Sequence, residues 1–214
     1  MRLPSKFRGI MKKHLNPVLF VSTALVMLSG CASYKAAPLN VPSSEAVHSS
    51  SAVKNNDIFI TAKAYNRADC KKYLDRDVIA KGYQPIQLYI QNNSNKSYAF
   101  SLSSIDLPYA RGEEVARKVH TSTVGRALAY GIPGLVVCLP LIIPAVVDGI
   151  KSSEANDALD SDFSSKIARD RTIAPYSDFN KIIFVPVGDF QQSFNVTLID
   201  QESRKPETFN VFAG

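Results

Sequence analysis

The sequence predicts a mainly β fold, an antiparallel immunoglobulin-like sandwich interrupted by an apolar helical insertion at about residues 113–170. Two observations lead to this prediction. Short segments on both sides of the insertion alternate apolar and polar residues, which is the period of a half-buried strand. The insertion instead combines a helical apolar period with an uncharged run that contains prolines.

Three predicted strands precede the insertion. Residues 57–64 form the first, and residues 69–78, which are more polar, predict a short helix or turn. Residues 83–91 alternate most clearly and form the second strand. The asparagine-rich segment 92–96 favours a tight turn, because Asn tolerates the left-handed conformation. Residues 97–107 then return as the third strand, which completes the pattern of a hairpin.

Three further strands follow the insertion. Residues 181–187 are rich in β-branched and aromatic side chains, and Pro186 ends this strand or confines it to an edge. Residues 193–200 and 207–213 alternate again. The two groups of three strands are the basis for predicting a two-layer sandwich.

The insertion contains two different patterns. An amphipathic helix is predicted for residues 153–169, in which four apolar residues recur at a spacing of four: Ala155, Leu159, Phe163 and Ile167. The uncharged run 127–147 is long enough to span a bilayer, but three prolines within it remove backbone donors and interrupt a straight helix.

Three interpretations of this apolar run remain open. It forms a broken helical hairpin buried against the β domain, a re-entrant or interfacial hairpin in the membrane, or a true membrane span. An apolar surface of this size requires a partner in water. The candidate membrane or partner contacts are Leu135, Val136, Val137, Leu139, Leu141, Ile142 and Ile143.

The first 30 residues have the organisation of a secretory signal. The apolar run 18–27 is too short for a bilayer, which needs about 20 apolar residues. Met11, which is followed by two lysines, is as good a start as Met1. The positive charges before the apolar run are Arg2, Lys6, Arg8, Lys12 and Lys13.

The segment Leu28-Ser29-Gly30-Cys31 resembles the lipobox of bacterial prolipoproteins. The resemblance covers about the first 33 residues. It implies cleavage between Gly30 and Cys31, a covalent diacylglycerol on the Cys31 thiol and an N-acyl chain, such as palmitate, on the new amine. It therefore implies that the lipid bilayer is a partner through Cys31, since two or three acyl chains anchor a protein stably.

The resemblance also suggests a location in the cell envelope. Ala32 stands where an Asp marks inner-membrane retention in enteric-type bacteria, so an outer-membrane location facing the periplasm is favoured, with the inner membrane as the alternative. Residues 31–56 are predicted to be the lipidated cysteine and a flexible tether, because small and polar residues dominate there. Residues 57–214 are then the folded domain.

The mature body also resembles uncharacterised lipoproteins of Gram-negative bacteria. The similar pieces are residues 85–94, the Gly- and Pro-rich apolar stretch and residues 155–163. This resemblance brings no activity with it.

The net charge does not indicate nucleic-acid binding. The whole chain carries +6, but the five basic residues before Cys31 have no acidic counterparts there. Cleavage leaves 20 basic against 19 acidic residues, a net charge of +1. No basic stripe with interleaved aromatic residues is present, so we expect no nucleic-acid partner.

The residues of the folded part do not suggest catalysis or a metal site. His14 lies in the signal and His48 in the tether, which leaves His120 alone in the domain. The acidic residues between 154 and 162 are predicted to form a solvated helix face, with Lys166 and Arg169 at ion-pairing distances. Cys70 and Cys138 are compatible with one disulfide or with two free thiols, of which Cys138 would be a small buried apolar group.

We therefore expect a non-enzymatic, envelope-anchored lipoprotein without a cofactor other than its covalent lipid. Its β domain would be an interaction or structural module, and its apolar insert would contact the membrane or an envelope protein partner. One alternative is an accessory subunit of an envelope transport or secretion assembly. A hydrolase of cell-wall or lipid substrates is the third hypothesis, against which the absence of paired catalytic residues argues.

Overall fold

A computed structural model describes residues 33–42, 53–55, 57–121 and 142–214, with the backbone alone for 53–55 and 142–151. Three α-helices lie in this part of the chain: α3 Arg67–Leu74, α4 Gly112–Val119 and α6 Ile142–Lys166. Its strands are β1 Val53–Asn55, β2 Ile58–Ala64, β3 Tyr83–Asn92, β4 Tyr98–Phe100, β5 Arg171–Ile173, β6 Ser177–Pro186, β7 Ser193–Asp200 and β8 Pro206–Phe212. Short 3-10 helices are η1 Ile79–Lys81, η2 Leu102–Ser104 and η4 Val187–Asp189.

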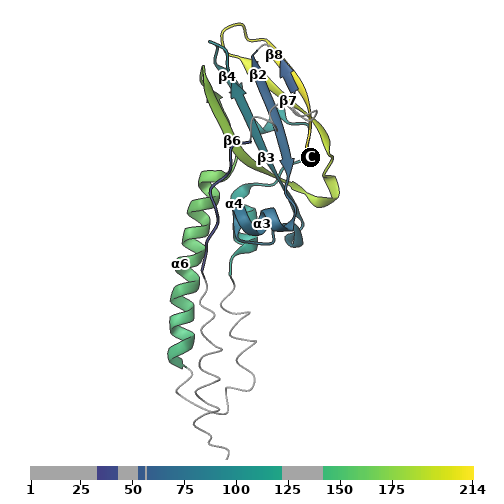
Figure 1. Cartoon of the computed structure of the whole chain (residues 1–214). Coiled ribbons are helices and arrows are strands. Elements are labelled where there is room, and N and C mark those ends of the chain that lie inside the picture. Colours follow the sequence, from purple (N-terminus) through teal and green to yellow (C-terminus); the bar gives the residue numbers. More distant parts are fainter. Residues whose placement is uncertain (1–32, 43–52, 56, 122–141) are drawn as a thin grey trace, which may run out of the picture. The chain divides into compact units, whose positions relative to one another are not determined.

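The strands form two antiparallel sheets of four strands each (Figure 1). The first sheet has the order β1-β2-β3-β6 and the second the order β5-β4-β7-β8. The prediction of a mainly β protein is therefore confirmed. Strand β7 begins and ends where the alternation predicted, and β2, β3 and β8 agree with it to within one residue at each end.

Side chains from both sheets build one hydrophobic core, which is why the two layers stay together. The alternating positions of β2 and β3 are fully buried in it, as the sequence predicts. Aromatic residues of the two sheets also meet there, with the rings of Phe100 and Phe179 4.6 Å apart. The main members are Ile58, Ile60, Ile86, Leu88, Ile90, Phe179, Ile183, Val185, Tyr98, Phe100, Phe194, Val196, Leu198, Phe209 and Val211.

The predicted hairpin of residues 83–91 and 97–107 is wrong. Strand β3 pairs with β2 and β6, whereas β4 is only three residues long and pairs with β5 and β7 in the other sheet. The buried amide of Asn92 holds the connection, since its Nδ2 donates to the carbonyls of Lys96 and Ala174, 2.7 and 2.8 Å away. These bonds lead the chain across to the second sheet instead of back along β3.

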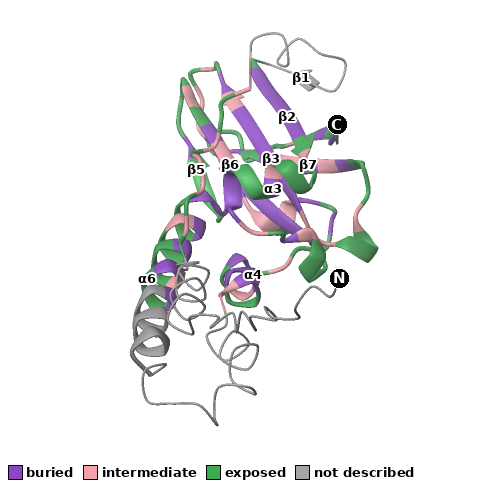
Figure 2. Ribbon diagram, turned by 60° about the horizontal axis from the view of Figure 1, so that its bottom comes forward, coloured by how far each residue is buried: buried purple, intermediate pink, exposed green. Residues whose placement is uncertain are grey.

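The helical insertion between β4 and β5 is confirmed for its described residues. Helices α4 and α6 flank residues 122–141, which lie outside the description together with most of the apolar run 127–147. In Figure 2 both helices carry buried as well as exposed residues. The four apolar residues predicted to share one helix face are all buried: Ala155, Leu159, Phe163 and Ile167.

A second hydrophobic cluster joins the three helices to the outer face of the first sheet. Phe163 of α6 stacks on Phe184 of β6, with ring centroids 5.8 Å apart. Helix α3 adds Cys70 and Leu74, and begins with a capping box in which the Asn66 side chain accepts from the Asp69 backbone N–H. The short helix predicted within residues 69–78 is thus confirmed, although it starts earlier.

Residues 33–42, which we call the strap, correct the predicted flexible tether 31–56. The strap lies against the folded part, and Tyr34, Ala37 and Leu39 pack on the second cluster. Further along the chain, β1 pairs with β2. Apolar contacts and backbone partners are available to these residues, so the tether prediction is wrong for the strap and for β1.

Candidate functional site: the bound strap

The residues predicted to contact lipid or a partner fall mostly outside the described part. This holds for the cleavage position Gly30-Cys31 and for Leu135, Val136, Val137, Leu139 and Leu141. Ile142 and Ile143 form the start of α6, where the backbone alone is described. The described residues nearest to Cys31 in the sequence are those of the strap, which makes its contacts the candidate site.

Backbone and amide hydrogen bonds hold the strap along its length. The Ala37 N–H donates to the carbonyl of Lys72 at the end of α3, 2.8 Å away. Farther along, the Asn40 carbonyl accepts from Gln87 Nε2 at 2.8 Å and from Asn180 Nδ2 at 3.1 Å. Gln87 of β3 also donates from Nε2 to Asn180 Oδ1 of β6, 2.7 Å away, so the strap is attached both to a helix and to two strands of the first sheet.

Lys166, in the last turn of α6, is the central residue of the site. Its side chain is only 6% exposed, and its ammonium group donates to three acceptors. These are the Ala37 carbonyl and the Tyr73 carbonyl, each at 2.8 Å, and Asp162 Oδ2 at 2.6 Å. One buried cation therefore joins the strap, the end of α3 and α6, and each of its three protons has a partner.

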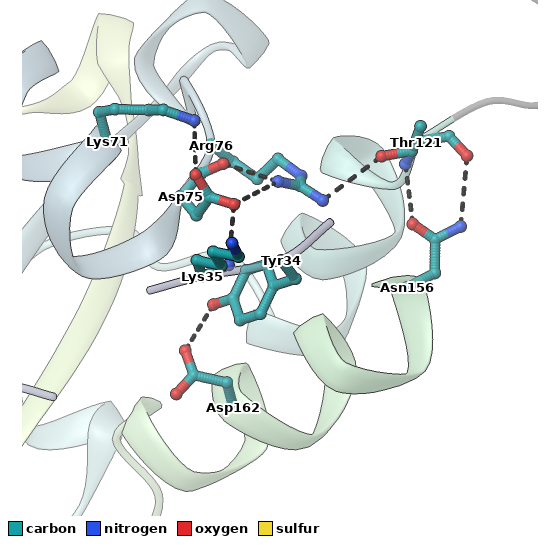
Figure 3. Close-up of polar contacts among 8 residues, drawn as sticks. All are labelled: Tyr34, Lys35, Lys71, Asp75, Arg76, Thr121, Asn156 and Asp162. Carbon is teal, nitrogen blue, oxygen red and sulfur yellow. Dashed lines mark hydrogen bonds and ion pairs between the residues drawn. The ribbon is translucent and has the colours of Figure 1, made fainter. Parts of the chain in front are cut away.

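Tyr34 makes the second tie between the strap and α6. Its hydroxyl donates to Asp162 Oδ2 at 2.5 Å (Figure 3). This carboxylate oxygen therefore accepts from both Tyr34 and Lys166. Burial raises the pKa of the Tyr34 phenol above its usual range, and the neighbouring carboxylate raises it further. The phenol thus remains a proton donor. The guanidinium of Arg76 lies 5.3 Å from the centroid of the Tyr34 ring.

Asp75 completes the set of contacts from the other side. It ends α3 in the left-handed conformation, with φ 49°, and this turns its carboxylate toward the strap. The carboxylate accepts the Lys35 N–H at 3.0 Å, and it also pairs with Lys71 and Arg76. Burial alone would raise the pKa of Asp75, but these donors outweigh it and hold the pKa below its usual value.

The same network reaches the place where the described chain leaves α4. Arg76 Nη2 donates to the Thr121 hydroxyl at 3.3 Å, and Asn156 of α6 binds the backbone of Thr121 through both ends of its amide (Figure 3). Tyr34, Thr121 and Asn156 therefore belong to one connected group of contacts. The strap and the described residues on both sides of segment 122–141, Thr121 and helix α6, therefore belong to the same group of contacts.

Among the described residues, His120 and Cys70, the other groups singled out in the sequence, lie apart from the strap contacts. His120 ends α4 and its Nε2 lies 2.7 Å from Asp160 Oδ1, at the surface. Cys70 is buried, which raises the pKa of its thiol to about 11, while Cys138 lies outside the description. Within the described ranges, no three His, Cys, Asp or Glu side chains are grouped as a metal site requires.

Sequence reasoning missed the residues that bind the strap. A signal was present for Lys166, which lies seven residues after Leu159 and three after Phe163, on the apolar face of the predicted helix. The pairing of Asp162 with Lys166 follows the predicted spacing, but it is partly buried and does not belong to a solvated face. For Tyr34 and Asp75 the sequence offers no comparable sign, since they are far apart in the chain.

No protein-family model, curated protein or solved structure matches the chain. In the part of the chain that the structure describes, no helix is both long and apolar enough to cross a membrane.

Proposed function

We propose that the protein is a non-enzymatic lipoprotein of the bacterial envelope, held on the membrane by lipid on Cys31. The binding of the strap to the domain is the observation that carries the argument. The three residues from Cys31 to Tyr34 span at most about 11 Å when extended. A lipid on Cys31 would therefore hold the helical end of the domain close to the bilayer.

This arrangement differs from that of a protein on a long tether. A free coil of about 25 residues would have an end-to-end distance of roughly 25–30 Å and would let the domain reorient. A bound strap gives the domain one preferred orientation, with the helices toward the membrane and the sheets away from it. An oriented β module suits a binding or structural role, which is the function we favour.

For the β module we infer an immunoglobulin-like topology. In that fold strands A, B and E share one sheet, while C, F and G share the other, with Greek-key connections. The order β2-β3-β6 in one sheet and β4-β7-β8 in the other agrees with this assignment. The edge strand β8, with Phe212 45% exposed, is where a partner strand could be added.

The apolar insert is proposed to contact the membrane or an envelope partner. Its flanks, Thr121 and α6, are tied to the strap through Arg76 and Asn156. Short chain connections therefore lead from one end of the domain to both the lipid and the apolar residues. An accessory role in a larger envelope assembly would use the same surface, with an integral membrane protein in place of lipid.

The test is membrane fractionation with a carbonate wash, together with incorporation of labelled palmitate, in an export-competent host. We expect the wild type to acquire the label and to pellet with membranes, and Cys31→Ser to lose the label. Ser33→Ala, two residues further on, is the matched control and should behave as wild type. A wild-type chain that never acquires lipid would rule the proposal out.

A further inference from the structure

The strap and helix α6 run in the same direction. Lys166 binds the carbonyl of Ala37, whereas Asp162, one turn nearer the N-terminus of the helix, binds Tyr34. Ala168, just after α6, donates its N–H to Ile182 of β6 at 2.8 Å, so the C-terminal end of the helix adjoins the sheet. From there α6 runs away from the sheets (Figure 1). Its N-terminal end therefore lies in the direction in which the strap leads toward Cys31.

Helix α6 extends farther in this direction than the chain leading to Cys31 can reach. Twenty residues separate Asp162 from Ile142, a rise of about 30 Å along the axis. The chain from Tyr34 to Cys31 covers at most about 11 Å. Ile142 thus lies roughly 20 Å farther along this axis than the chain from Tyr34 to Cys31 can extend, and still about 10 Å farther if the side chains of the Tyr34–Asp162 contact are stretched along the axis.

The first six residues of α6, which lie farthest beyond this reach, are apolar. Residues 142–147 read Ile-Ile-Pro-Ala-Val-Val, and the first charged residues after them, Asp148 and Lys151, lie nearer the limit that the chain from Tyr34 to Cys31 can reach. A rise of about 9 Å over the six apolar residues is less than half the thickness of a hydrocarbon core of about 30 Å. The charged residues that follow would then lie near the headgroups.

We propose that the first turns of α6, residues 142–147, are inserted into the hydrocarbon layer of the same leaflet that holds the lipid on Cys31. This inference rests on the proposed lipidation, and it names the bilayer as the partner of this end of the helix. The bound strap is the reason, because it prevents the domain from moving away from the bilayer. The protein is then attached at two points, a covalent lipid and a short helix end.

The experiment uses the absence of tryptophan from the chain, which makes any introduced Trp the only one. Full-length lipidated Ile143→Trp and Val146→Trp would be reconstituted in vesicles of phosphatidylethanolamine and phosphatidylglycerol. Some vesicles contain lipid brominated near the headgroup, and others lipid brominated deep in the acyl chain. Ala158→Trp, an exposed position farther along the same helix, is the matched control.

We expect both N-terminal probes to emit at shorter wavelength than the control and to lose most of their emission to the deep bromines. The Ala158→Trp emission should be unaffected by them. Quenching at Ile143→Trp and Val146→Trp no stronger than at the control, or by the shallow bromines alone, would overturn insertion. Flotation of the vesicles is measured in parallel. A protein that fails to float contradicts the lipid anchor itself, which distinguishes failure of the proposed function from failure of this inference.

Discussion

Lys166 is the residue on which the position of the strap depends. Its buried ammonium group binds the Ala37 and Tyr73 carbonyls and the Asp162 carboxylate. Replacement by Met keeps the length of the side chain but removes the charged donor that these three acceptors share. We expect Lys166→Met to lower the free energy of unfolding by about 3 kcal/mol, as is typical when one partner of a buried ion pair is removed.

Urea denaturation would measure this loss, with Lys205→Met in an exposed loop as the control. The variant should also be cut by trypsin after Lys35 faster than the wild type, because its strap is released. Equal stability of Lys166→Met and Lys205→Met would show that the three contacts contribute little.

Asp75 makes the stability depend on pH. Its donors hold the pKa of the folded carboxyl below the unfolded value of about 3.9. A depressed carboxyl pKa stabilises the fold above the unfolded pKa, and this contribution is lost as the pH falls through the folded pKa. Removing the carboxylate should therefore weaken the acid sensitivity of the protein.

The measurement is the free energy of unfolding of wild type and Asp75→Asn between pH 7 and pH 3. We expect the free energy of unfolding to fall more for the wild type than for the variant as the pH is lowered from 7 to 3. This interval ends just below the unfolded pKa of about 3.9, where the stabilising contribution of the carboxylate is being lost. Parallel curves for the two proteins would mean that Lys71, Arg76 and the Lys35 N–H do not stabilise the charged carboxylate.

At the scale of elements, the start of α4 is fitted closely to the end of α6. A Cβ atom on Gly112 would lie 2.2 Å from Cδ1 of the buried Ile167, so that side chain or the helix would have to shift. Alanine favours a helix by up to about 1 kcal/mol over glycine, but overpacking costs about 1–3 kcal/mol. We expect Gly112→Ala to destabilise the protein by about 1 kcal/mol.

A double-mutant cycle checks this prediction. Ile167→Ala removes the atoms that would clash, so Gly112→Ala should cost less in that background. Gly188→Ala, where nothing lies within 4 Å of an added Cβ, is the control and should be nearly neutral. Strict additivity of Gly112→Ala and Ile167→Ala would mean that the close approach of α4 to Ile167 carries no energetic cost.

For the molecule as a whole, the strap should stay bound with or without lipid. All its described contacts are made within the chain, and they include the N–H groups of Lys35 and Ala37. Hydrogen exchange should therefore show protection of these two amides in both the wild type and Cys31→Ser. If these amides exchange at the rate of an unstructured peptide in either protein, the strap is not bound and the prediction of a flexible tether is correct for it.

The predicted elements and their faces agree with the structure where the information is local. The alternation of Ile86, Leu88 and Ile90 marks the face of β3 that packs in the core between the sheets, and the spacing of Leu159 and Phe163 marks the buried face of α6. A strand or a helix imposes its period on nearby residues, so these faces can be read from a short window of sequence. The candidate site could not be read in this way, because its members are brought together from segments that lie far apart in the sequence.

The mainly β composition, the place of the helical insertion and the signal-like pattern that ends at Cys31 all follow from local patterns in the sequence. The pairing of β3 with β6 instead of β4, and the binding of residues 33–42, became known only from the folded chain. The physical reason is that these outcomes depend on contacts between distant residues. Lys166 and Ala37 are 129 positions apart in the chain. The residues around Ala37 form no local pattern that predicts a buried cation next to its carbonyl.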